Sequence, residues 1–176
     1  MMKFFSLVLL MLLASLSAGS AQMVGGKQPD QVVLKASFDK PFPLVYKAIK
    51  QTLESQTCRV ERDKYQEDEK TGLFKANITS EFCVFVSGED STETYLERYS
   101  FRVPYIRGAS WTSGRIQYKI RLMEKEDGNT ELELRGEVSG FEEHVTHATH
   151  FWTSNGVLEQ KLMDLIKENI AAAKTQ

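Results

Sequence analysis

The apolar positions form their clearest pattern near the end of the chain, where helical spacing predicts an amphipathic helix over residues 155–173. One stripe of this helix is apolar and consists of Leu158, Leu162, Leu165, Ile166, Ile170 and Ala173. The opposite side is polar and consists of Gln160, Lys161, Asp164, Lys167, Glu168 and Lys174. A helix this short does not hold its shape alone in water, so a surface elsewhere in the chain must cover the apolar stripe.

Alternating apolar and polar residues predict a first strand over residues 32–38, followed by a helix. A cap is expected at Asp39 or Lys40, and the helix should end near Ser55. Pro41 or Pro43 should lie in its first turn, where proline loses no hydrogen bond. The predicted buried stripe consists of Val45, Ala48, Ile49, Thr52 and Leu53.

The middle of the chain is predicted to be mostly strand. We expect a strand over residues 58–64 and a polar turn over 66–72. A further strand over 74–79 should continue as an apolar segment over 82–86. Residues 95–105 are predicted as another strand, whose apolar face consists of Tyr95, Tyr99, Phe101, Val103 and Tyr105.

Residues 115–139 predict a β-hairpin, and the alternation of side chains determines its register. A two-residue turn at Asp127 and Gly128 would set Leu122 opposite Glu133 and mismatch the faces along the whole hairpin. A three-residue loop over 126–128, with Gly128 in a left-handed conformation, restores the match. The predicted pairs are Ile116 with Val138, Tyr118 with Gly136, Ile120 with Leu134, Leu122 with Leu132, and Arg121 with Glu133.

These elements predict an α+β fold with the order strand, helix, several antiparallel strands and C-terminal helix. One face of the sheet is apolar, and a short N-terminal helix and a long C-terminal helix packed on that face would cover it. Residues 31–176 are enough for one domain with a single core, and the sequence has no internal repeat or second domain boundary.

The first 21 residues have the pattern of a secretory signal peptide. Lys3 is the only charge, an apolar run follows over residues 4–13, and small residues lead to a cut after Ala21. The run is too short to span a bilayer, although an uncut N-terminal anchor is the alternative. We therefore expect a periplasmic or secreted protein, with residues 22–30 as a flexible lead-in.

Charge excludes one class of partner. The chain of 176 residues has a formal net charge of −2, and its charges are mixed along the sequence. No block of Lys and Arg stands out, which argues against nucleic acid as the main partner. No second apolar run is long enough to predict a transmembrane span.

Cys58 and Cys83 are the only two cysteines, and an oxidising compartment would favour a disulfide between them. A turn centred between Lys70 and Thr71 sets the two cysteines opposite each other. Their side chains would nevertheless point to different faces of the sheet, unless a bulge near residues 79–81 turns one of them. Two separate thiols, one of them buried, are the alternative.

The three histidines, His144, His147 and His150, occur within one short segment. On a strand His147 points away from the other two, and on a helix His144 and His150 are about 9 Å apart along the axis. At most a neighbouring pair such as His144 and His147 could bind a metal ion. We predict no metal site and interpret the segment as a polar connection, with a pH-responsive surface as a further alternative.

Six aromatic residues are candidates for lining a ligand pocket: Tyr99, Phe101, Tyr105, Trp111, Tyr118 and Trp152. The alternative is that these rings are plain core, because aromatic side chains bury a large area. The sequence contains no Gly-rich phosphate loop, nucleophile elbow or H-E-x-x-H motif. It therefore predicts no cofactor and favours a binding or structural role over an enzyme.

A first strand, the turn Phe38-Asp39-Lys40-Pro41-Phe42, a short helix and a final helix led by Leu158 and Leu162 follow one another in this chain. This order resembles the helix-grip architecture of the START/Bet v1-like superfamily, and it is similar in outline to the domains of the bacterial outer-membrane lipoprotein BamC. The resemblance implies a cavity between the sheet and the C-terminal helix. Such a cavity often holds a lipid or another apolar ligand and is otherwise filled as core.

Three functions follow as hypotheses. The first is an exported protein that holds an apolar small molecule or lipid between the sheet and the C-terminal helix. The second is a non-catalytic structural or interaction module of the cell envelope, which would bind a protein partner through an exposed edge strand at residues 95–105. The third is a metal-assisted hydrolase that uses the histidine segment around His147.

Overall fold

The computed structural model describes residues 31–88 and 92–173. The predicted signal peptide, its cut after Ala21 and the lead-in at residues 22–30 lie outside the described residues. The elements in chain order are β1 (Leu34–Phe38), α1 (Phe42–Ser55), β2 (Val60–Glu67), β3 (Phe74–Ser87), α2 (Thr92–Tyr99), β4 (Trp111–Glu124), β5 (Thr130–Glu142), β6 (Ala148–Thr153) and α3 (Val157–Ala172). The predicted α+β class is confirmed.

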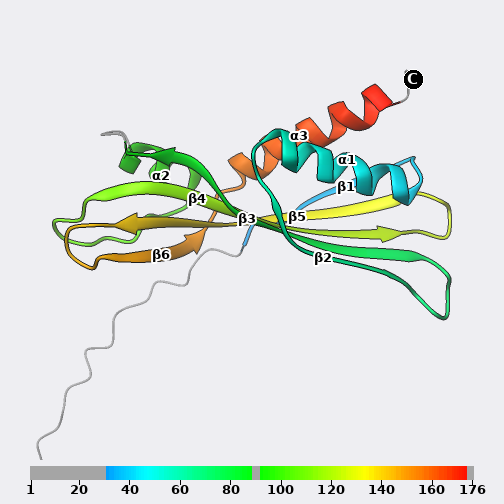
Figure 1. Ribbon diagram of the computed structural model, residues 1–176, viewed down its shortest axis with the longest axis horizontal. Helices are drawn as coiled ribbons and strands as arrows, with labels where there is room; N and C mark the ends of the chain where they lie inside the picture. Colours follow the sequence, from blue (N-terminus) through cyan, green and yellow to red (C-terminus); the bar gives the residue numbers. More distant parts are fainter. Residues whose placement is uncertain (1–30, 89–91, 174–176) are drawn as a thin grey trace, which may run out of the picture.

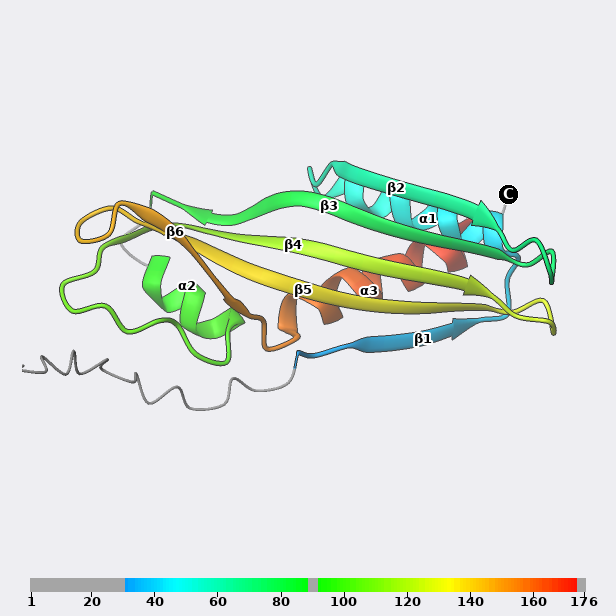
Figure 2. The ribbon, with the colours of Figure 1, turned by 90° about the horizontal axis from the view of Figure 1, so that it is seen from below.

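All six strands form one antiparallel sheet with the order β1-β5-β4-β3-β2, and β6 also pairs with β5. The same edge of β5 carries β1 along residues 130–134 and β6 along residues 137–142. The three helices lie on one face of this long sheet, which we call the covered face (Figures 1 and 2). Helices α1 and α3 lie side by side over one part of it, the α3 end, and α2 lies over the other part, the α2 end.

The hairpin register is confirmed at every predicted pair. Ile116 is opposite Val138, Ile120 is opposite Leu134, and the outer-face pair of Arg121 and Glu133 forms as well. The Lys125 amide donates to the Asn129 carbonyl at 2.9 Å, which closes a three-residue loop. Gly128 has a φ of 81°, the left-handed conformation that the loop requires.

The helical stripes are also confirmed in their main positions. In α1 the buried residues are Phe42, Val45, Ala48, Ile49, Thr52 and Leu53. In α3 they are Leu158, Glu159, Leu162, Met163, Ile166 and Ile170. The buried arc of α3 is wider than predicted because the helix packs against both the sheet and α1, and Asn169 donates to the Thr52 hydroxyl of α1 at 2.7 Å. Ala173 is exposed, contrary to the predicted stripe.

The predicted strand over residues 95–105 is wrong. Its first half is helix α2, which buries Thr92, Leu96 and Tyr99 at helical spacing. Residues 101–110 follow without regular secondary structure. Glu97 interrupts the aromatic alternation on which the strand prediction depended, and Glu93 and Arg98 lie at the helix ends where their charges stabilise the helix dipole. The edge strand proposed as a partner-binding surface therefore does not exist.

Among the described residues, no helix is both long and apolar enough to cross a membrane.

Candidate functional site

A cavity of about 220 Å³ lies at the α3 end, between α3 and the strands β3 and β4, with the end of α1 beside it. Most of its wall is aliphatic, aromatic or sulfur. The lining residues are Gln56, Cys58, Cys83, Val84, Phe85, Ile116, Tyr118, Leu158, Lys161, Leu162 and Leu165. The cavity therefore lies between the sheet and the C-terminal helix.

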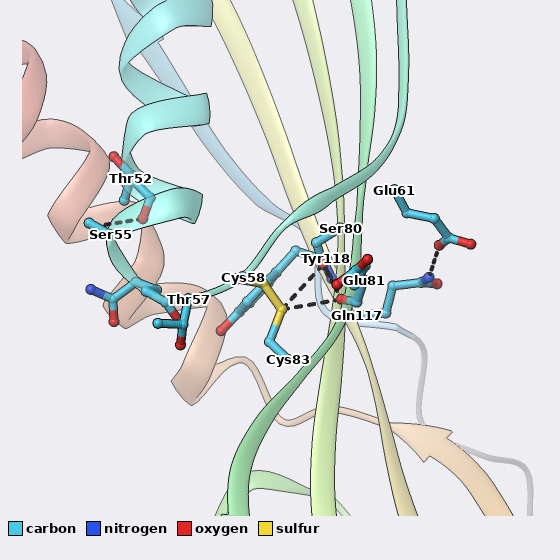
Figure 3. Close-up of a disulfide and its surroundings, with 11 residues drawn as sticks. Thr52, Ser55, Thr57, Cys58, Glu61, Ser80, Glu81, Cys83, Gln117 and Tyr118 are labelled. Carbon is cyan, nitrogen blue, oxygen red and sulfur yellow. Dashed lines mark hydrogen bonds between the residues drawn. A yellow bond between two sulfur atoms is a disulfide. The ribbon is translucent and has the colours of Figure 1, made fainter.

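One wall of the cavity is a disulfide between Cys58 and Cys83, whose Cα atoms are 5.2 Å apart. Cys58 follows α1 and is buried, and Cys83 lies in β3 (Figure 3). Of the two alternatives for the cysteines, the disulfide is confirmed.

The disulfide depends on a bulge in β3, which is confirmed at the predicted place. The pairing of β3 with β4 shifts register between Thr79 and Phe82. This shift turns Cys83 to the covered face, where it lies opposite Ile116. The hydroxyl of Ser80 accepts a hydrogen bond from the Tyr118 amide at 2.9 Å, so that the buried amide at the bulge still has a partner (Figure 3).

The cavity wall carries two prominent polar side chains, Tyr118 and Lys161. Figure 3 shows the Tyr118 ring next to Cys58, on the side of the sheet that faces α1. Burial, and next the negative charge of Glu159, raise the pKa of the Tyr118 hydroxyl, so that it remains protonated. The ammonium of Lys161 donates to the hydroxyl of Tyr99 at 3.2 Å and lies 5.0 Å from the centre of that ring.

Glu159, in the first turn of α3, is fully buried near the cavity. Its Oε2 accepts a hydrogen bond from Ser154 at 2.7 Å, whereas Oε1 has no hydrogen-bond partner among the described residues. Oε1 packs against Gly136, where an added Cβ would lie 2.6 Å away. Burial raises the pKa of Glu159, and the hydrogen bond from Ser154 opposes this rise only in part.

Of the six predicted pocket aromatics, only Tyr118 lines this cavity. Trp111 and Trp152 pack edge to face at the α2 end, with ring centres 5.6 Å apart. Tyr99, the last residue of α2, is buried and contacts Phe85 of β3 and Lys161 of α3. The remaining two, Phe101 and Tyr105, are 49% and 85% exposed.

The histidines do not converge. His144 and His147 lie in the loop between β5 and β6, and His150 lies in β6 against Trp111. The Thr146 hydroxyl and Nε2 of His150 are 2.8 Å apart. Within the part of the chain that the structure describes, no group of three His, Cys, Asp or Glu side chains is placed to hold a metal ion.

Sequence reasoning missed Glu142, which organises the histidine loop. Its buried carboxylate accepts backbone hydrogen bonds from Ser110, His144, Val145 and Thr146, and another from the Thr146 hydroxyl. These donors outweigh the cost of burial and hold the pKa of Glu142 far below its usual value. They also hold a loop in which His147 has a φ of 49°, a conformation that residues other than glycine rarely adopt.

No protein-family model matches the chain, and no curated protein matches it in sequence.

Proposed function

We propose that this protein binds a small apolar ligand in the cavity between α3 and the strands β3 and β4. The observation that carries the proposal is the apolar wall of that cavity, formed by Ile116, Leu158, Leu162 and the disulfide. A covalent cross-link and a sheet support this wall, so the space does not depend on a mobile loop. The N-terminal sequence pattern supports placing this activity in a periplasmic or secreted protein.

The size of the cavity limits the ligand. Pockets for drug-sized molecules have volumes of about 300–1,000 Å³, and this one has about 220 Å³. A single short aliphatic chain or one small ring system fits this volume better than a whole membrane lipid. We therefore propose that the ligand is an apolar molecule no larger than one short aliphatic chain or one small ring system.

Titration with 1-octanol, followed by two-dimensional NMR, tests the proposal. Signals of Ile116, Leu158 and Leu162 should shift in a saturable way. Leu165→Trp should abolish this binding, because Leu165 lines the cavity and a larger side chain there fills it. Val157→Trp is the matched control, since Val157 is 41% exposed on the same helix and does not line the cavity. Shifts that survive Leu165→Trp, or no saturable shift at all, would remove the proposal.

A second candidate is an interaction module of the cell envelope, and one surface favours it. On the sheet face opposite the helices, Phe151 is 53% exposed. The rings of Phe82 and Phe151 contact each other across this open face, with centres 5.6 Å apart. A photo-crosslinking residue at position 151 should then give a specific product that the same residue at exposed Glu168 does not give. Equal products at both positions would remove this candidate.

A further inference from the structure

The polar side chains around the cavity can all donate hydrogen bonds, and the only charged one is a cation. Lys161 contributes an ammonium, Tyr118 a hydroxyl and Gln56 an amide, whereas no Asp or Glu is among the lining residues. An ammonium has only hydrogen-bond donors, and a protonated phenol and an amide can both donate. The rim and wall of the cavity are therefore suited to a ligand that accepts hydrogen bonds and carries negative charge.

The ammonium of Lys161 is held in place without an acidic partner. It donates to the neutral hydroxyl of Tyr99 at 3.2 Å and lies near the face of that ring. The ion pairs among the described residues do not include Lys161. A lysine ammonium has three donors, so this one keeps donors for a ligand after it has bonded Tyr99.

The hydroxyl of Tyr118 adds a second donor. Tyr118 is 8% exposed, and its ring lies beside Cys58 (Figure 3). Within the described residues its hydroxyl has no hydrogen-bond partner. Burial, and next the charge of Glu159, raise the pKa of the Tyr118 hydroxyl, which therefore stays protonated and able to donate. Glu159 does not line the cavity.

We propose that the ligand is a small amphipathic carboxylate, with its head group bound by Lys161 and the Tyr118 hydroxyl and its aliphatic chain packed among Ile116, Leu158 and Leu162. This inference rests on the proposed function, because it names the chemical class of the ligand in the same cavity. The charge of the head group binds to the lysine, and the chain supplies the apolar area that the cavity wall buries.

Three probes with the same eight-carbon chain separate the two proposals: octanoate, 1-octanol and octylamine. Calorimetric titration should give octanoate the lowest Kd, about tenfold below that of 1-octanol, because a carboxylate forms an ion pair with Lys161 whereas a neutral hydroxyl only accepts a hydrogen bond from it. Octylammonium should bind most weakly, since it meets Lys161 with like charge. Equal binding of octanoate and 1-octanol, or tighter binding of octylamine, would overturn the carboxylate inference alone. If none of the three binds, the proposed function itself fails.

Two variants assign the head-group contacts. Lys161→Met removes the ammonium but keeps an exposed, unbranched side chain, and it should raise the Kd of octanoate about tenfold and that of 1-octanol by a smaller factor. Tyr118→Phe keeps the ring and should raise the Kd of octanoate by a smaller factor. Lys167→Met is the matched control, because Lys167 is exposed on the same helix and does not line the cavity. An equal loss of octanoate binding in Lys167→Met would show a general charge effect and would contradict the assignment to Lys161.

Discussion

At the α2 end of the sheet, Trp111 and Trp152 pack directly against Gly140, where an added Cβ would lie 2.8 Å from one ring and 3.0 Å from the other. At the α3 end, a cavity of about 220 Å³ remains between α3 and the sheet. The difference follows from the side chains: large rings fill the space above a glycine, whereas branched aliphatic residues on α3 leave a gap beside a disulfide. One end of the covered face is therefore closed core, and the other retains a cavity.

Each end also buries one glutamate, and the pKa values of the two carboxyl groups are shifted in opposite directions. Glu142, at the α2 end, accepts hydrogen bonds from four backbone amides and one hydroxyl, which lowers its pKa against the cost of burial. Glu159, at the α3 end, accepts one from Ser154, and burial raises its pKa. Burial alone does not set the ionisation of a carboxyl group, because the number of donors decides whether the charged form is stabilised.

The largest difference between the two ends should appear when the disulfide is removed, because this removal should lower the Tm and change only the α3 end. The double variant Cys58→Ala and Cys83→Ala opens a loop between residues 25 positions apart, and the lost constraint on the unfolded chain should lower the Tm by about 10 °C. In NMR spectra, signals of Ile116 and Leu158 should shift, whereas the indole signals of Trp111 and Trp152 should stay in place. Reduction of the wild-type protein serves as the control and should give the same fall. Shifts of both indole signals would show that the two ends are not independent.

A smaller loss of stability should follow from Glu142→Gln. The amide group of Gln would face backbone amides that now donate to a carboxylate, so we expect the Tm at neutral pH to fall by about 5 °C. In the folded protein the pKa of Glu142 is below its usual value of 4.5. The stabilisation is therefore present above pH 4.5 and is lost as the pH falls below that value.

Thermal melts between pH 3 and pH 7 would check this prediction, with Glu143→Gln as the matched control. Glu143 is the next residue along the chain and is exposed, so its substitution should change little. An unchanged Tm in Glu142→Gln would show that the hydrogen bonds to Glu142 do not stabilise the histidine loop.

Local patterns were sufficient to predict much of the α3 end. The hairpin register followed from alternation, because an error of one residue would have placed Leu122 opposite a charge. A bulge in β3 was the condition under which Cys58 and Cys83 could share a face, and both the bulge and the disulfide are present. The hairpin register depends on residues that are near neighbours in sequence, and the bulge depends on one pair of strands. Both can therefore be derived from local patterns.

The α2 end could not be predicted in the same way. The aromatic alternation at residues 95–105 hid the helical spacing of Thr92, Leu96 and Tyr99, which was the signal that could have found α2. Glu142 gave no signal, because its donors come from two separate loops that only the fold brings together.

The cavity also differs from the predicted aromatic pocket, since its wall is mostly aliphatic. Its one cation, Lys161, belongs to the side of the C-terminal helix that was predicted to be polar. A cavity lined by β3, β4, α3 and the residues that follow α1 has no local pattern in the chain.

Glu159→Gln should give the smallest change in Tm, and this change should be an increase. Glu159 gave no sequence signal either, because an acidic residue in the first turn of a helix is ordinary. In the folded protein the pKa of Glu159 is above its usual value of 4.5. The charged form of Glu159 therefore destabilises the fold at pH values above the folded pKa. Glu159→Gln removes this charge and should raise the Tm at neutral pH by about 2 °C.

The pH dependence distinguishes a charge effect from a change in packing at Glu159. As the pH falls from neutral through the folded pKa toward 4.5, the wild-type protein should gain stability relative to Glu159→Gln, and the advantage of the variant should disappear. Glu168→Gln, on the exposed side of the same helix, is the control and should follow the wild type. A lower Tm for Glu159→Gln at neutral pH would mean that the carboxylate stabilises the fold through its bond to Ser154, and the two buried glutamates would then differ only in degree.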